Sequence, residues 1–296
     1  MAIDSDLRPA PAPAAAAGKT NRRRRTPMQW IVLGLCSLFA LIMLAPFLLL
    51  VLNAFKSGAD YSSGGPVAWP TSFTLDAFRD YLAMVNFPRA LWNSILISTV
   101  VAFAGTGLAL ISAYAIGIGR VKGSAVILAV LLLATMVPHE ALIYPLFYGA
   151  QETGTFNTVW SVIIIFTVLQ AAFGTYLLSS VMSTVPRELL DAAGIDGAGR
   201  WTILWKIILP VLRPTLAVLV VFFFIWTWNE FYIPVVLLSD QSSQTVPIAL
   251  STLRGQHSID ITTLNAGSLL SLLPTLVFFL IFQRTLSHGV TAGSIK

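Results

Sequence analysis

Six apolar runs, each close to the length of a membrane-spanning helix, dominate this 296-residue chain. A transmembrane helix needs about 20 apolar residues. Only 10% of the residues are charged, against roughly 25% in soluble domains, which excludes a water-soluble fold. The sequence therefore predicts an all-α polytopic membrane protein with six transmembrane helices. The predicted spans are residues 30–52, 91–118, 126–148, 159–181, 216–238 and 266–282.

The distribution of basic residues sets the orientation of these spans. Four arginines, Arg22 to Arg25, precede the first run as in a signal peptide. That run is too long for a signal peptide and no small-residue cleavage site follows it, so we expect a retained helix. The positive-inside bias predicts that both termini are cytoplasmic, and this asymmetry explains the basic pI without a nucleic-acid partner. With that orientation, the outside segments hold only 4 of the 18 Lys and Arg residues: Lys56, Arg79, Arg89 and Arg254.

The segments between the runs complete the predicted organisation. We expect a disordered cytoplasmic tail over the Pro/Ala-rich residues 1–27, because such a composition buries little apolar surface. An extracellular loop over 53–89 carries an amphipathic stretch, with Leu75, Phe78, Leu82 and Val85 at helical spacing, which we expect to lie along the membrane surface. The further predicted parts are the first transmembrane helix 28–52, a core 90–284 with five transmembrane helices, a cytoplasmic loop 182–213, an extracellular loop 239–262 and a cytoplasmic tail 285–296.

Residues that carry chemistry in enzymes do not form a recognisable site in this sequence. The Gly18-Lys19-Thr20 tripeptide lacks the upstream glycine of a phosphate-binding loop, because Pro13 stands in its place. His139, His257 and His288 have no ligand spacing, and the single cysteine, Cys36, lies within the first span. We therefore predict no catalytic residues, no metal site, no cofactor bound by this chain and no enzyme activity.

Two carboxylates, Glu140 and Glu230, fall inside predicted spans beside prolines. Burying a charge in hydrocarbon is costly, so such residues usually face a bundle interior or a water-filled path. With the adjacent Asn229 they are our candidates for the translocation path. The alternative stays open that both carboxylates lie near the outer interface and reach water there.

The stretch VPRELLDAAGIDGAGRWTILWKIILP, residues 185–210, interrupts the apolar sequence on the predicted cytoplasmic side. Pro186 suits a first helical turn and Glu188 complements the helix dipole, while Gly197 is expected to stop this helix. A second helix follows, with an apolar stripe of Trp201, Leu204, Trp205 and Ile208, and we expect prolines to end it before the fifth span. The short helix, glycine break and second helix favour a docking surface over a plain connector.

The spacing within this stretch resembles the EAA loop of ABC importer permeases. The consensus of that loop is Glu-Ala-Ala, three residues, Gly, nine residues, Ile, one residue and Leu-Pro. All spacings match, with one departure, an aspartate in place of the glutamate. The matching residues are Asp191, Ala192, Ala193, Gly197, Ile207, Leu209 and Pro210.

Three further stretches resemble the sugar branch of this family, in particular the smaller maltose-type permease subunit. They are PLFYGAQETGTFNT at 145–158, WNEFYIPVVLL at 228–238 and HGVTAGSIK at 288–296. The resemblance covers the chain from the first span to its last residue. It implies the type I ABC importer permease fold, a bacterial cell membrane location and a carbohydrate substrate such as an oligosaccharide or a polyol.

The resemblance also implies partners. They are a second permease subunit, two ATP-binding subunits that hold ATP and Mg, and an extracellular solute-binding protein, all assembled in membrane lipid. The first helix of the EAA loop would dock on an ATPase subunit through Glu188 and Asp191, with Ala192 and Ala193 packing closely. The loop 239–262 would face the binding protein.

Two alternatives use the same residues differently. An ion-gradient-driven secondary transporter often shows internal repeats and broken helices with ion-coordinating groups at mid-membrane, and neither a repeat nor a mid-membrane carboxylate is found in the sequence. A non-transporting membrane scaffold would also use a docking loop.

Overall fold

The computed structural model describes residues 27–119, 121–253 and 260–292, and for residues 284–292 it describes the backbone alone. The predicted disordered tail before residue 27 and the last four residues of the predicted carboxy-terminal tail lie outside these ranges. The chain divides into two units, 1–47 and 48–296. In chain order the helices are α1 (Pro27–Ala54), α2 (Gly58–Gly64), α3 (Asp76–Met84), α4 (Phe87–Gly117), α5 (Ser124–Thr135), η1 (His139–Leu142), α6 (Ile143–Glu152), α7 (Val159–Met182), α8 (Arg187–Ile195), α9 (Arg200–Ile203), η2 (Leu204–Ile208), α10 (Leu209–Asn229), α11 (Tyr232–Leu237), α12 (Val246–Thr252) and α13 (Ile261–Ala292).

The described part of the first unit is a stretch of the α1 helix, residues 27–47. Its side chains are apolar on every face, which is typical of a helix surrounded by lipid. The α1 helix starts and ends within a few residues of the first predicted span, and Cys36 lies exposed on it.

The core of the second unit is formed where α4 packs along α7 and α10. Small residues let these helices approach closely, as is common between membrane helices. A methyl group added at Gly174 on α7 would lie 2.8 Å from the Cβ of Ala109 on α4 and 3.1 Å from the ring of Phe223 on α10. All three helices therefore meet at one glycine.

The third predicted span is broken instead of continuous. Within the described ranges, five helices are long and apolar enough to cross a membrane, and there is a sixth span if α5 and the segment His139–Glu152 are taken together. These two parts are bent by 93°. Pro138 explains the break, because proline lacks an amide hydrogen and disfavours a helical conformation in the residue before it.

The fifth span differs from its prediction at both ends. We expected Pro210 and Pro214 to end the helix of the cytoplasmic loop, but α9, η2 and α10 form one uninterrupted helical rod from Arg200 to Asn229. The η2 segment is a π-helical turn just before Pro210, in which the Leu209 amide donates to the carbonyl of Leu204. Such a widened turn accommodates the missing proline hydrogen bond. The rod ends at Asn229, whereas the predicted span continued to residue 238, because Pro234 would clash with the carbonyl of Glu230 in a continuous helix.

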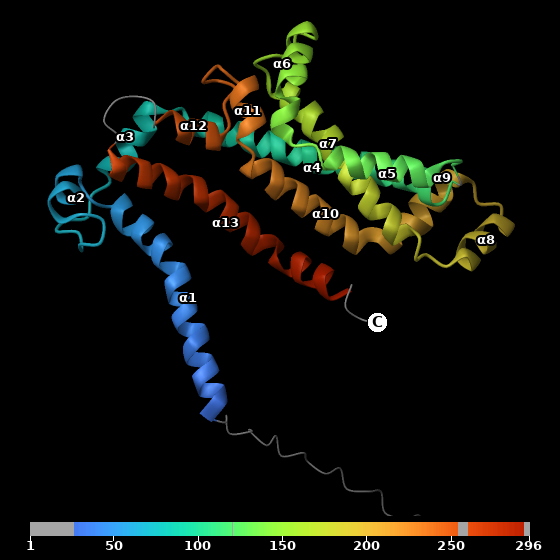
Figure 1. The fold of residues 1–296 in the computed structure, drawn as a ribbon, viewed down its shortest axis with the longest axis horizontal. Helices are drawn as coiled ribbons and strands as arrows, with labels where there is room; N and C mark the ends of the chain where they lie inside the picture. The colour runs from blue at the N-terminus through green and yellow to red at the C-terminus, as the bar shows by residue number, and fades with distance from the viewer. Residues whose placement is uncertain (1–26, 120, 254–259, 293–296) are drawn as a thin grey trace, which may run out of the picture. The chain divides into compact units, whose positions relative to one another are not determined.

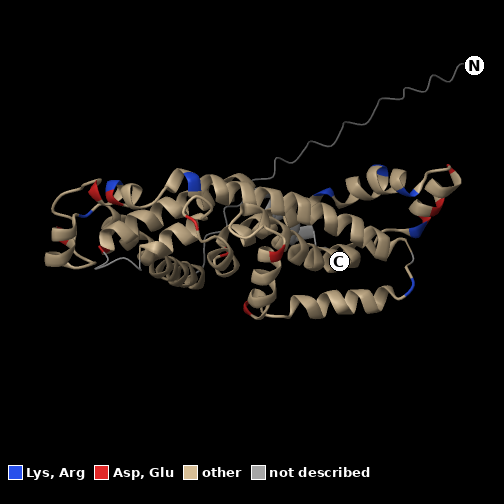
Figure 2. Cartoon of the chain, turned by 90° about the horizontal axis from the view of Figure 1, so that it is seen from above, with Lys and Arg blue, Asp and Glu red and all other residues tan. Residues whose placement is uncertain are grey.

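One end of the second unit is built from short helices around the start of α13. In Figure 1, α3 and α12 lie at one end of the long helices, and α8 and α9 lie at the other. The predicted amphipathic helix is α3, and its Tyr81 packs against Gly267 of α13. Figure 2 shows that most charged residues of this unit gather toward the two ends, with a largely uncharged length between them.

Candidate functional site

The α8 helix carries the first half of the EAA-like pattern. Pro186 occupies the position before the first helical residue, and Glu188 lies in the first turn, where a negative charge complements the helix dipole. Glu188, Asp191 and Ala192 are exposed, and Ala193 is buried. The only ion pair in the described ranges joins Arg79 and Asp76, so both carboxylates of α8 are free to meet another molecule.

Gly197 ends α8 in a specific backbone geometry. Its φ is +75°, a left-handed conformation that favours glycine. The Ala198 amide donates to the Ala193 carbonyl at 2.9 Å, and the Gly197 amide donates to the Gly194 carbonyl at 3.1 Å. These two bonds define a Schellman motif. The predicted glycine stop is therefore present, and it fixes the direction in which the chain leaves α8.

The α8 helix is attached to the core on one side only. Val185, just before α8, and Leu190 on α8 pack with the core formed by α4, α7 and α10, and Ala193 is buried. Leu189 is 43% exposed, and Ile195 is 87% exposed. The outward face of α8 thus presents apolar and acidic groups together, and the described part of the chain leaves them exposed.

The second half of the pattern lies on the rod that starts at Arg200. Ile207 and Leu209 are half-buried, and Pro210 is exposed. Of the predicted apolar stripe, Leu204 and Ile208 are buried, whereas Trp201 and Trp205 are 63% and 50% exposed. The stripe is divided because the rod continues straight into α10, so only positions four residues apart face the core.

The candidate path residues gather where the broken third span meets the end of α10. The ring of His139, next to Glu140, stacks on Trp226 with a centroid distance of 6.1 Å. Glu230 lies one turn beyond Trp226 and accepts a hydrogen bond from the Tyr232 amide at 3.1 Å, while the Asn229 side chain donates to the Ile225 carbonyl. The structure therefore places Glu140, Asn229 and Glu230 in one region, although they are far apart in sequence.

Buried polar groups beside this region were missed by the sequence analysis. Gln170 on α7 is fully buried and donates to the Thr227 hydroxyl on α10 at 2.8 Å. The carbonyl oxygen of the Gln170 side chain has no hydrogen-bond partner in the described part of the chain. A glutamine in the middle of a predicted span was a signal for such a bond between helices.

The loop after α11 is held against the amino-terminal ends of α4 and α7. Asn157, whose φ is +61°, accepts hydrogen bonds from the Asp240 amide and the Ser243 hydroxyl, both at 2.9 Å. The Asn93 side chain donates to the carbonyls of Ser242 and Gln244. The first part of the predicted extracellular loop is thus an ordered surface, and it continues into α12.

Comparison with protein families places most of the chain in one group. The family described as binding-protein-dependent transport system inner membrane component matches residues 105–292. This range includes the whole EAA-like pattern, the broken third span and both candidate carboxylates.

Individual relatives cover nearly the whole chain. The lactose transport system permease protein LacG of Rhizobium radiobacter is 32% identical, over 94% of this chain and 99% of its own length. The trehalose/maltose transport system permease protein MalG of Thermococcus litoralis is 30% identical, over 88% and 94%. A solved bacterial ABC transporter involved in the import of the acidic polysaccharide alginate has the same fold, with a TM-score of 0.74, 20% identity and coverage of 88% and 98%.

Proposed function

Because this chain belongs to the family of binding-protein-dependent transport system inner membrane components, we propose that it imports a carbohydrate. We also propose that α8 couples ATP hydrolysis in the ATPase to the membrane-spanning helices of this chain. As a permease subunit of an ABC importer, it lies in the inner membrane and leaves ATP hydrolysis to a separate subunit. The family depends on a binding protein and an ATPase, so the ion-gradient and scaffold alternatives are set aside.

The finer assembly is part of the proposal. This chain forms half of the translocation pathway with a second permease, on two ATP-binding subunits that hold ATP and Mg. Both termini are cytoplasmic, and the loop of residues 239–262 faces the solute-binding protein. A carbohydrate substrate is supported by relatives whose names mention lactose, arabinooligosaccharides and trehalose or maltose.

The single observation that carries the coupling role is the exposed, rigidly ended α8 helix. A coupling element must be fixed to the moving core at one side and free to dock at the other. Leu190, which packs on the core, supplies the fixed side, and Glu188, Asp191 and Ala192 supply the free side. The Schellman motif at Gly197 fixes the direction in which the chain leaves this helix toward the rod that starts at Arg200.

The coupling role is tested by filling the free face of α8 without disturbing the fold. Ala192→Trp places a large side chain at an exposed position of α8, so the chain folds but docking is blocked. Ala217→Trp, at an exposed alanine of α10, is the matched control. In proteoliposomes that contain the complete transporter, we expect Ala192→Trp to abolish binding-protein-stimulated ATP hydrolysis and uptake, and the control to keep both. Unchanged stimulation in Ala192→Trp would overturn the assignment.

The candidate path residues and the substrate need separate tests. Glu140→Gln and Glu230→Gln are expected to reduce uptake while leaving the assembly of the complex intact, because they change the charge of the path and not the docking surface. The affinity of the cognate binding protein for a panel of sugars identifies the substrate. The absence of binding to every sugar would refute the carbohydrate proposal and leave the coupling role untouched.

A further inference from the structure

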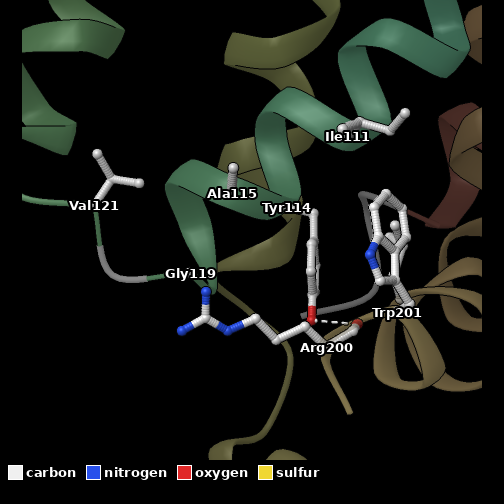
Figure 3. Close-up of a pocket in the computed structure, with 8 residues that line it drawn as sticks. Ile111, Tyr114, Ala115, Gly119, Val121, Arg200 and Trp201 are labelled. Atoms are coloured by element: carbon white, nitrogen blue, oxygen red, sulfur yellow. Dashed lines mark hydrogen bonds between the residues drawn. The ribbon is translucent and has the colours of Figure 1, made fainter.

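A groove of about 320 Å³ lies between the end of α4 and the start of the α9–η2–α10 rod. One wall is formed by Ile111, Tyr114 and Ala115, and the other by Arg200, Trp201 and Leu204 (Figure 3). The Tyr114 hydroxyl donates to the Arg200 carbonyl at 2.8 Å, which ties the two walls together at the polar end. The groove is therefore a built feature of the packing between two membrane helices.

The chemistry of the groove changes along its length. Its sides are apolar, and no lining residue is acidic. Arg200 lines its cytoplasmic end, and the exposed Lys122 follows the lining residue Val121. Figure 3 shows the Arg200 side chain extending toward the loop at Gly119. The Arg200 guanidinium has no carboxylate partner within the described ranges.

Such an arrangement matches one kind of ligand. An apolar slot between transmembrane helices takes an acyl chain, and unpaired basic groups on the cytoplasmic side take an anionic headgroup. Tryptophan and tyrosine are also the residues that prefer the level of the lipid headgroups. We propose that this groove binds an anionic phospholipid, with an acyl chain along Ile111, Ala115 and Leu204 and the phosphate on Arg200 and Lys122.

A bound lipid at this place would act on the coupling segment. Arg200 begins the rod and is joined to α8 by only four residues, Asp196 to Gly199. A lipid wedged between α4 and the start of the rod would hold the base of α8 against the core. The site itself depends on the membrane placement of the chain and not on the coupling role of α8, so the two proposals fail separately.

The test counts phospholipids that remain bound to the purified complex in native mass spectrometry. The probes are phosphatidylglycerol and phosphatidylcholine, each supplied in nanodiscs with the same acyl chains. The variants are Arg200→Gln and Lys122→Gln, which remove a positive charge, and Ala115→Phe, which fills the apolar slot. Arg213→Gln is the matched control, because Arg213 is exposed on α10 and its substitution removes the same charge outside the groove.

The expected result is selective retention of phosphatidylglycerol by the unaltered complex. One basic residue near a membrane surface contributes about 1 kcal/mol to the binding of anionic lipid, which corresponds to an approximately fivefold change in affinity. We expect Arg200→Gln and Lys122→Gln each to weaken retention about fivefold, Ala115→Phe to abolish it, and Arg213→Gln and Arg200→Lys to preserve it.

Three outcomes would overturn the lipid site. Equal retention of the two lipids would remove the role of charge, and equal effects of Arg200→Gln and Arg213→Gln would remove the role of the groove. If the complex that carries Arg200→Gln loses its ATP-binding subunit but keeps phosphatidylglycerol, the groove is a protein contact.

Discussion

Gly197 and Gly199 provide a matched pair for testing how α8 works. Both glycines are exposed, and a Cβ at either position would meet no atom within 4 Å. They differ in backbone conformation, since Gly197 has a φ of +75°, whereas Gly199 has a φ of −70° and a ψ of 164°. Any effect of adding a methyl group therefore reports the backbone and not a clash.

The expected energies differ between the two positions. A Cβ in the left-handed conformation costs roughly 1–2 kcal/mol, so Gly197→Ala should disfavour the capped form of α8 about 5- to 30-fold. At Gly199 the extended conformation suits alanine, so the substitution there avoids this cost. Gly197→Asn should be intermediate, because asparagine tolerates the left-handed region.

The assay is binding-protein-stimulated ATP hydrolysis and uptake by the complete transporter in proteoliposomes. We expect Gly197→Ala to lower both, Gly199→Ala to leave both unchanged and Gly197→Asn to recover part of the loss. Equal activities for the two alanine variants would refute the reasoning, because the capped geometry of α8 would then carry no function.

Three further predictions concern stability. Gly174→Ala should lower the melting temperature, at a cost of about 1–3 kcal/mol, because the added methyl would lie 2.8 Å from the Ala109 Cβ. The control Gly107→Ala meets open space and should not lower the melting temperature. Equal melting temperatures for the two variants would contradict this prediction. Lys56→Met should speed proteolysis in the loop after α2, because the fully buried ammonium donates to two carbonyls of that loop at 3.0 and 3.5 Å. An unchanged rate of cleavage would contradict the idea that Lys56 holds this loop. Burial raises the pKa of Tyr81. The stabilising effect of the protonated side chain is therefore complete below the normal tyrosine pKa of about 10 and is lost as pH rises through the higher pKa of the folded state. In a pH series of melting curves, Tyr81→Phe should flatten the alkaline loss of stability, and identical slopes for the two proteins would contradict the burial effect.

Hydropathy was sufficient to predict which parts of the chain are apolar helices, because the cost of unpaired backbone groups in lipid leaves few alternatives. The boundaries depended on prolines, and each proline acted differently. Pro138 breaks a span through a 93° bend, whereas Pro210 continues a helix because a π-helical turn precedes it. The local sequence around these prolines does not distinguish the two outcomes, since the packing of the neighbouring helices decides between them.

The candidate site was predictable where it depends on backbone chemistry. Gly197 ends α8 as predicted, because only glycine adopts a φ of +75° without cost. The faces of α8 were harder to predict, because Leu189 is apolar yet exposed. A docking surface departs from the usual burial of apolar residues, and a helical pattern alone does not show which apolar face the chain itself covers. The contact of His139 with Trp226 depends on the bend at Pro138 and could not be predicted from spacing.

The central claim is that the exposed face of α8 docks on an ATP-binding subunit, and site-specific cross-linking tests it most directly. Cys36 is the only cysteine of the chain, so Cys36→Ser gives a background in which Ala192→Cys carries the only reactive thiol of this subunit. With a short bifunctional reagent on the complete transporter, we predict a covalent adduct with the ATP-binding subunit from Ala192→Cys and none from Ala217→Cys. No adduct from Ala192→Cys in an active complex, or equal adducts from both positions, would contradict the account.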